Sequence, residues 1–241
     1  RPSLLMAGDS LAVGNRRDDL ETYELLFGSV ASAQTAAFTF AVDFAWDFTS
    51  LFRPIAVRGP LVVVHAAVNP QLSERRDGVL ACLNVRTGSW EELGRGEFTV
   101  AAASPNGRWI GWQDEDQLSV IDLDSRRTSF QVSASAWRLA LSSELIAAIS
   151  GMELTVFSFD GTLVARSPLP EQPSWLFRCP DGFLSVSISG RLERWSREGL
   201  RPLPSLPFQL LDSNHLKLEL ICLGTQRLLS FDPIARTAAD L

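Results

Sequence analysis

The chain has 241 residues, of which 46% are hydrophobic and 21% are charged, as in an ordinary globular protein that can bury a large core. Its formal net charge is −6 and its basic residues are scattered. This argues against sequence-unspecific binding of nucleic acid, which needs a basic face that neutralises phosphates. Cys82, Cys179 and Cys222 share no close spacing, so neither a zinc site nor a disulfide framework is predicted.

No signal peptide is recognisable, and no apolar run is long enough to span a bilayer. We therefore expect a cytoplasmic protein that does not contact a membrane.

Residues 1–33 contain three short apolar segments, separated by Gly8-Asp9 and by the polar residues 15–19. Runs this short between turn-forming residues predict strands. The alternative is a helix over Asp18–Phe27, because Leu20, Tyr23, Leu26 and Phe27 would share one face of it.

Residues 34–52 show a different pattern, in which aromatic residues alternate with small or polar ones. The strict period of two predicts a strand with one aromatic face. We interpret the segment as an insertion whose aromatic face either packs on a neighbouring sheet or docks a protein partner. The residues assigned to partner binding are Phe38, Phe40, Phe44, Trp46 and Phe48.

After Arg53-Pro54 short strand-like runs return, with residues 69–78 forming a polar loop between two of them. Further on, Ser104-Pro105-Asn106-Gly107 stands between two apolar runs and predicts a hairpin. Asn and Gly both tolerate positive φ, so we expect a type I′ turn there. A similar turn, Cys179-Pro180-Asp181-Gly182, follows 75 residues later. Long helices are not predicted after residue 52.

A repeat organises these segments: a leucine is followed three positions later by an aromatic or branched residue, usually ahead of a polar turn. The leucines are separated by intervals of 60, 38, 36, 38 and 36 residues, and they are Leu20, Leu80, Leu118, Leu154, Leu192 and Leu228. A period in this range indicates a repeat architecture. Four short strands per repeat predict an all-β fold, a β-propeller of about six four-stranded blades in one domain over residues 1–241, with a seventh blade left open.

The repeats resemble divergent WD-repeat propellers. Ile121-Asp122 and Phe231-Asp232 stand where that family has Trp-Asp, and the two Pro-containing turns match its common first hairpin. The resemblance covers about residues 1–33 and 53–241. The sequence departs from the family in having no Gly-His dipeptide, and its single Trp-Asp pair, Trp46-Asp47, lies outside the repeat register.

A second resemblance concerns Leu5–Gly14, which is similar to the first block of GDSL (SGNH) ester hydrolases, while Asp212–His215 fits the Asp-x-x-His block of that family. It implies Ser10 as nucleophile, His215 as base and Asp212 as the group that orients it. The block that supplies oxyanion donors is missing, the hydrolase fold needs helices alternating with parallel strands, and Leu5–Gly14 aligns with the other repeats. We therefore interpret Gly8–Leu11 as a turn and retain the hydrolase as an alternative.

Other chemistry has weaker signals. His65 lies in an apolar run and is predicted to be a satisfied structural residue, and Asp114-Glu115-Asp116 is predicted to be a solvated turn, with a cation site as the alternative. The sequence has no Gly-rich phosphate loop and no paired metal-ligand spacing, so no metal or cofactor is predicted.

These observations predict a non-catalytic scaffold or protein–protein interaction module within a larger assembly. The alternatives are the ester hydrolase and a propeller that binds a small ligand in its central channel.

Overall fold

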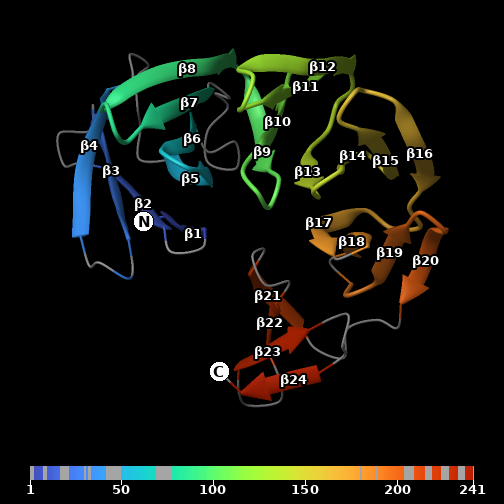
Figure 1. The fold of residues 1–241 in the computed structure, drawn as a ribbon. Helices are drawn as coiled ribbons and strands as arrows, with labels where there is room; N and C mark the ends of the chain where they lie inside the picture. Colours follow the sequence, from blue (N-terminus) through green and yellow to red (C-terminus); the bar gives the residue numbers. More distant parts are fainter. Residues whose placement is uncertain are drawn as a thin grey trace. The chain divides into compact units, whose positions relative to one another are not determined.

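The computed structural model describes residues 3–7, 10–16, 22–29, 31, 34–41, 50–68, 78–179, 181–187, 189–203, 209–214, 219–223, 228–232 and 237–240. In these residues 24 strands form six four-stranded sheets and no helix occurs (Figure 1). All strand pairs are antiparallel, and in every sheet the strands lie in chain order. The prediction of an all-β fold with six four-stranded repeats is confirmed.

The chain divides into two units, Arg1–Ser135 and Ala136–Leu241, which we call unit 1 and unit 2 and describe separately. Unit 1 contains the sheets β1 (Ser3–Ala7), β2 (Ser10–Arg16), β3 (Thr22–Ser29) and β4 (Gln34–Ala41); β5 (Ser50–Arg58), β6 (Leu61–Val68), β7 (Gly78–Asn84) and β8 (Ser89–Gly96); and β9 (Phe98–Ala103), β10 (Trp109–Asp114), β11 (Gln117–Asp122) and β12 (Arg127–Ser133).

Unit 2 contains the other three sheets. They are β13 (Arg138–Leu141), β14 (Leu145–Ser150), β15 (Glu153–Ser158) and β16 (Leu163–Pro168); β17 (Pro173–Cys179), β18 (Gly182–Ser187), β19 (Leu192–Ser196) and β20 (Gly199–Leu203); and β21 (Gln209–Asn214), β22 (Glu219–Leu223), β23 (Leu228–Asp232) and β24 (Thr237–Asp240).

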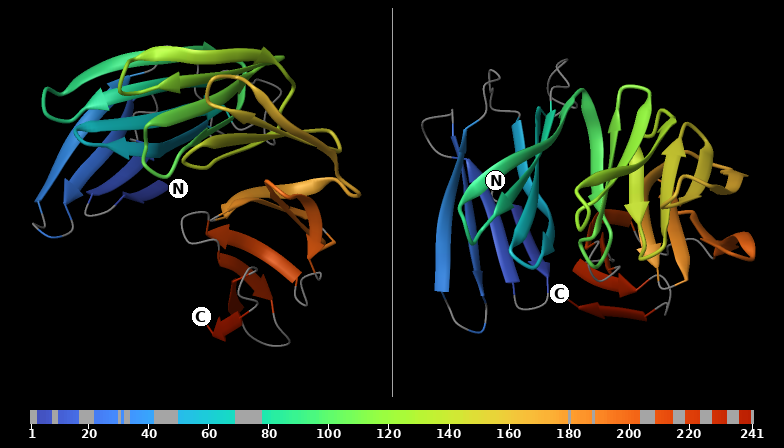
Figure 2. Two further views of the ribbon diagram at one scale, coloured as in Figure 1. Left: turned by 45° about the vertical axis from the view of Figure 1, so that its right-hand side comes forward. Right: turned by 45° about the horizontal axis from the view of Figure 1, so that its top comes forward.

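The predicted repeat explains how neighbouring sheets pack in unit 1 (Figure 2). Leu80 and Leu83 of β7 point to opposite faces of their sheet, as their odd separation requires. Leu80 packs with Ile110 of the third sheet, whereas Leu83 packs with Leu25 of the first sheet, and all four side chains are fully buried. Burying one such side chain contributes about 1.5–3 kcal/mol, so the second sheet is stabilised on both faces.

The third strand of the first sheet lies where the sequence left a helix open as an alternative. Thr22–Ser29 is β3 and pairs with β2 and β4, so the helix considered over Asp18–Phe27 is wrong. Pairing with both neighbours outweighs the helical periodicity of a few apolar residues. Leu20, the first leucine of the repeat, lies outside the described residues.

The segment 34–52 belongs largely to the sheets. Gln34–Ala41 is β4 and pairs with β3 along its whole length, and Ser50 begins β5 of the second sheet. The part left between the two sheets is residues 42–49, which lie outside the described residues, as do residues 69–77 of the predicted polar loop. The structure thus narrows the predicted insertion to the residues that join the first sheet to the second.

The turn between β9 and β10 is a hairpin, as predicted, but of another type. The amide of Gly107 donates to the carbonyl of Ser104 at 2.9 Å, and Gly107 has φ +66°. Asn106 is not among the described residues with positive φ, so the predicted type I′ turn is wrong. Pro105 provides the reason, because its ring fixes φ near −65°, which suits the second position of a type I turn.

Within unit 2 the same packing joins the fourth and fifth sheets. Leu154 and Val156 of β15 share one apolar cluster with Phe183 of β18 and Trp195 of β19, all 2% exposed or less. The rings of Phe183 and Trp195 lie 6.0 Å apart between centroids. In the described part of the chain, no helix has the length and apolarity needed to cross a lipid bilayer.

Candidate functional site

Ser10 occupies an ordinary position in a hairpin. It is the first residue of β2, pairs with Ala7 of β1 and Ser29 of β3, and is half-buried. A GDSL nucleophile follows a strand of a parallel sheet flanked by helices, whereas the described residues of this chain form only antiparallel sheets. Asp212 lies in β21 of unit 2, and His215 lies outside the described residues. The fold required by the hydrolase resemblance is therefore absent from the described residues.

The aromatic residues assigned to partner binding begin with Phe38, which is half-buried and packs against an apolar cluster that contains Val62 and Val64 of the second sheet. The indole nitrogen of Trp90 donates to the carbonyl of the next residue, Thr39, at 3.1 Å. Phe38 thus packs on a neighbouring sheet, which was the other interpretation of this face. Phe40 is part of β4, and Phe44, Trp46 and Phe48 lie outside the described residues.

His65 is structural, as predicted, but it is not satisfied. It is 2% exposed, and neither ring nitrogen has a hydrogen-bond partner among the described residues. Burial, together with the charge of Arg53 on the adjacent strand, lowers the pKa of His65 to about 3. The imidazole is therefore neutral at physiological pH.

The cysteines behave as inert buried thiols where they are described. Cys82 and Cys179 are free and buried. Burial raises the pKa of Cys82, and burial with the nearby charge of Asp181 raises that of Cys179 to about 11. Because the thiolate is the reactive form, neither residue is a nucleophile at neutral pH.

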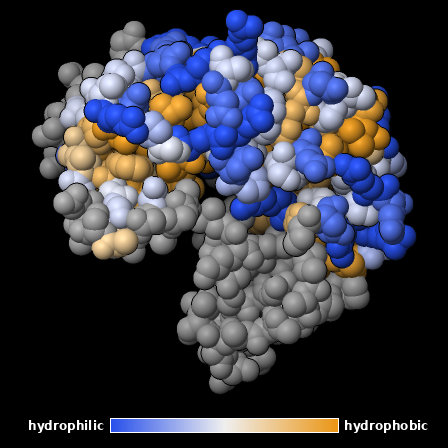
Figure 3. Space-filling model, viewed as in Figure 1, coloured by the Kyte–Doolittle hydropathy of each residue, from blue (hydrophilic) through white to orange (hydrophobic). Residues whose placement is uncertain are grey.

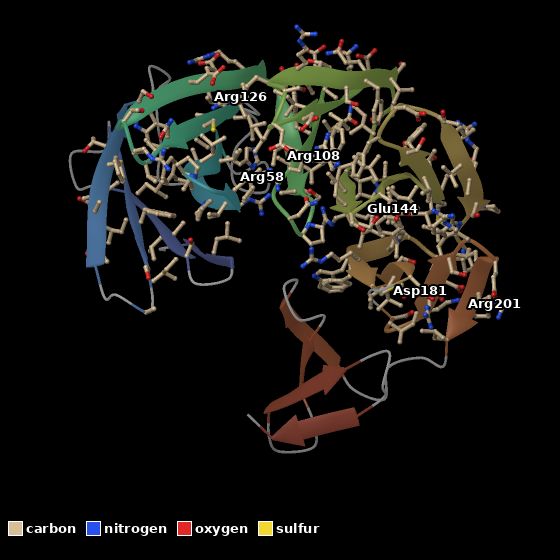
Figure 4. The ribbon with its side chains drawn as sticks, in the orientation of Figure 1. Arg58, Arg108, Arg126, Glu144, Asp181 and Arg201 are labelled. Atoms are coloured by element: carbon tan, nitrogen blue, oxygen red, sulfur yellow. The ribbon has the colours of Figure 1, made fainter. Side chains whose placement is uncertain are left out.

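An ion-pair cluster that the sequence did not indicate joins the second and third sheets (Figure 4). Arg58, at the end of β5, donates from Nε and Nη2 to the two carboxylate oxygens of Asp124, both at 2.6 Å. Arg108 donates from Nε and Nη2 to Asp122 at 3.0 and 2.8 Å. Arg58 also donates to the carbonyl of Asn106 at 3.1 Å. We call the four charged residues Arg58, Arg108, Asp122 and Asp124 the inter-sheet clasp.

The electrostatics of the inter-sheet clasp follow from these contacts. Hydrogen bonds from Arg108 lower the pKa of Asp122, and those from Arg58 lower the pKa of Asp124. Asp122 also accepts the backbone amide of Asp124 at 3.0 Å, which fixes the turn after β11. All four carboxylate oxygens accept a hydrogen bond from an arginine, so the carboxylates of the inter-sheet clasp are neutralised by arginines and the clasp holds the sheets together.

The predicted acidic turn Asp114-Glu115-Asp116 joins β10 to β11, with Glu115 and Asp116 exposed and Glu115 at φ +46°. The carbonyl of Glu115 accepts the side-chain amide of Gln113 at 2.9 Å, so the turn is held by a neutral hydrogen bond. No group of three His, Cys, Asp or Glu side chains that could hold a metal occurs among the described residues.

A second feature is a set of arginines on the first strands of the sheets. In unit 2, Arg138 of β13 donates from Nε to the carbonyl of Ser174 in β17 at 2.8 Å and from Nη1 to the carbonyl of Trp137 at 2.9 Å. Its guanidinium carbon lies 4.7 Å from the centre of the Trp137 ring. Burial lowers the pKa of both Arg138 and Arg178, although both stay charged. Their signal in the sequence is an arginine inside an otherwise apolar strand.

No protein-family model matches the sequence, and neither does any curated protein. Solved structures do match the fold. The chain resembles BamB from Moraxella catarrhalis at 14% identity and a TM-score of 0.56, covering 95% of this chain and 65% of BamB. It resembles Sqt1 from Saccharomyces cerevisiae at 10% identity and a TM-score of 0.61, covering 95% of this chain and 69% of Sqt1.

A third similar structure is the β-propeller domain of the Trilobed protease from Pyrococcus furiosus, at 8% identity and a TM-score of 0.63, covering all of this chain and 83% of that domain. The chain spans less than two thirds of the BamB structure. Together these likenesses confirm the β-propeller fold that the sequence predicted, and at such identities they establish the fold alone.

Proposed function

We propose that this β-propeller is non-catalytic and binds a protein partner, as an interaction module or scaffold of a larger assembly. The observation that carries the proposal is an adjacent pair of exposed apolar residues on the outer strand of the fourth sheet. Leu163 and Val164 of β16 are 51% and 45% exposed. Exposed apolar side chains that lie together mark interaction surfaces more often than single ones do.

The geometry of β16 supports contact through side chains. β16 pairs only with β15 among the described strands, and a β-bulge at its start places Val164 out of register with β15. The second half of the strand carries Arg166 and Pro168, which hinder pairing with a further strand. The hydrophobic surface over this strand is visible at the right of Figure 3. A partner would therefore cover Leu163 and Val164 rather than extend the sheet.

Phe44 and Trp46 remain part of this proposal as additional partner contacts. Aromatic residues supply much of the binding energy at protein interfaces. Because Phe38 packs on a neighbouring sheet, the contacts would come from the later aromatic residues of that segment. We also propose a cytoplasmic location, which the free thiols of Cys82 and Cys179 support, since thiols stay reduced there.

The experiment that tests the proposal is affinity purification of the tagged chain from its native cells, followed by reconstitution with the purified candidate partner. We expect a saturable complex that weakens when Leu163 and Val164 are both replaced by serine. The control is Met152, which is 48% exposed. Leu145 of β14 is half-buried and is therefore not suitable as a control. The Met152→Ser variant should bind as the wild type does, and equal binding by all three proteins would argue against β16.

A further inference from the structure

Arg138 and Arg178 point into the same inter-sheet interface of unit 2. Arg138 stands opposite Ile149 in the β13–β14 ladder, and Arg178 stands opposite Phe183 in the β17–β18 ladder. Paired residues of a ladder share a face of the sheet. Because Ile149 and Phe183 belong to one apolar cluster, both arginines project from their first strands into the space where that cluster lies.

Among the described residues, these two arginines lack the carboxylate partners that other arginines have. Nine arginines form ion pairs with carboxylates within the described residues: Arg58, Arg95, Arg108, Arg126, Arg166, Arg191, Arg194, Arg197 and Arg201. Arg138 donates only to carbonyl oxygens, and Arg178 has no hydrogen bond or ion pair in the described part of the chain. The strands β13 and β17 contain no acidic residue.

Their position makes the lack of a partner informative. Both side chains are half-buried, so water screens them less than it screens an arginine on an outer strand. A guanidinium that is partly desolvated and has no carboxylate is costly to the fold, and it gains from an anion supplied by a ligand. Its planar set of N–H donors suits a carboxylate in particular.

The separation of the two arginines indicates the shape of that ligand. Arg138 donates to the carbonyl of Ser174, and Ser174 lies four residues before Arg178 in β17, which corresponds to about 13 Å of extended strand between the two backbone positions. A single small anion does not span this length. An extended chain does, because its side chains at alternate positions face one side.

We propose that the edge formed by β13 and β17 binds an extended acidic segment of a protein partner, with carboxylates on Arg138 and Arg178. This inference rests on the proposed protein-binding function and names the chemistry of the partner. The occupant is a peptide whose acidic residues recur on one side, so that its carboxylates can pair with the two guanidinium groups.

Fluorescence anisotropy with the full chain tests it directly. The probe is a labelled peptide in which glutamate alternates with serine, and the reference is the same peptide with glutamine in place of glutamate. We expect the acidic peptide to bind, the neutral one not to bind, and Arg138→Gln and Arg178→Gln each to weaken binding about tenfold. The matched control is Arg201→Gln on β20, because Arg201 is exposed and already paired with Glu198 (Figure 4); it should change binding less than about twofold.

Arg178→Gln keeps the test decisive if Arg138→Gln impairs folding, since Arg178 has no contact of this kind to lose. The inference would be overturned if Arg178→Gln bound the acidic peptide with the affinity of the wild type, or if the wild type did not bind the acidic peptide. Competition by free glutarate or inorganic phosphate as strong as by the unlabelled peptide would also overturn it, in favour of a small-anion site.

The two proposals fail in different ways. If the reconstituted partner complex forms and Arg178→Gln does not weaken it, the acidic-segment inference is wrong and the protein-binding function stands. If no protein partner associates with the purified chain, the protein-binding function is wrong, whatever the peptide does.

Discussion

Arg138 donates from Nε to the carbonyl oxygen of Ser174 at 2.8 Å and so links the first strands of two adjacent sheets in unit 2. Unit 1 contains a corresponding contact, in which Nη2 of Arg53 in β5 donates to the carbonyl of Ala101 in β9 at 3.4 Å. In both cases an arginine holds the next sheet through a carbonyl. A carbonyl does not neutralise the cation, so Arg138 can join two sheets and still attract an anion.

Gly107 is predicted to be required by the turn between β9 and β10. It has φ +66°, and a Cβ there would lie 2.5 Å from the carbonyl oxygen of Val57 on the second sheet. We expect Gly107→Ala to lower the free energy of unfolding by about 2–4 kcal/mol, from the strained φ and the backbone collision together. Urea denaturation measures this change.

Gly59 is the matched control, because it has φ +54° but nothing within 4 Å of its Cβ position. Gly59→Ala should cost only the conformational strain, about 1–2 kcal/mol. Equal losses in the two variants would show that the contact of Gly107 with Val57 has no energetic effect.

His65 should make the fold sensitive to acid. Its folded pKa of about 3 lies below the ordinary value of 6.5, so the unfolded state binds the proton first as the pH falls. The associated stability is fully present above pH 6.5 and is lost progressively toward pH 3. Between pH 7 and pH 5 the loss should be about 2 kcal/mol.

Replacing His65 by leucine removes this titration and also removes a buried polar group that has no partner in the described residues. Urea denaturation at pH 7 and pH 5 should therefore show a smaller loss of stability for His65→Leu than for the wild type. The carboxylates titrate in both proteins and cancel in the comparison. Identical pH dependence would mean that folding does not lower the pKa of His65.

Asp122 is predicted to stabilise the inter-sheet clasp. Asp122→Asn keeps one acceptor oxygen but loses the charge-assisted pair with Arg108, so the free energy of unfolding should fall by about 1–3 kcal/mol at pH 7. Because the folded pKa of Asp122 is lowered, this contribution is present above the ordinary carboxyl pKa and is lost as the pH falls through the folded value. Glu92→Gln, which breaks an exposed pair with Arg95, should cost less than about 0.5 kcal/mol. If Asp122→Asn lowered the free energy of unfolding no more than Glu92→Gln does, this would contradict a structural role for Asp122.

The aromatic residues of the segment 34–52 should separate into two classes. Phe38→Ala should lower stability by about 1–3 kcal/mol, because Phe38 is half-buried against the core of unit 1. Phe44→Ala and Trp46→Ala should leave the urea midpoint unchanged and weaken partner association about tenfold or more. Association that is unaffected by both of the latter changes would remove these residues from the interface.

The repeat made the fold predictable because the same strand pattern is used six times. Leu80 and Leu83 are buried on opposite faces, and their spacing in the sequence already required this. The turn type at Asn106 was misjudged because the pattern Asn-Gly was weighed without the φ fixed by Pro105. The predicted insertion was taken to begin at residue 34, but the aromatic strand that begins there, β4, completes the first sheet. Its composition differs from that of the other outer strands, which is why it was not recognised as one of them.

The candidate sites were less predictable because they depend on contacts between sheets. Arg58 and Asp124 are 66 residues apart in the chain, and no local pattern connects them. Within the described part of the chain, no carboxylate pairs with Arg138 or Arg178, and this property of the packed sheets has no counterpart in sequence spacing. Conversely, the local match of Leu5–Gly14 to a hydrolase block fell on two paired antiparallel strands, β1 and β2, since short motifs do not specify the fold around them.

The central claim is that this β-propeller binds a protein partner. The most direct measurement is the dissociation constant and stoichiometry of the complex between the purified chain and the purified protein that co-purifies with it, determined by calorimetry and analytical ultracentrifugation. The account predicts a saturable complex of defined stoichiometry that the double replacement of Leu163 and Val164 by serine weakens. A chain that sediments alone at all concentrations of that protein, with no heat of binding, would contradict it.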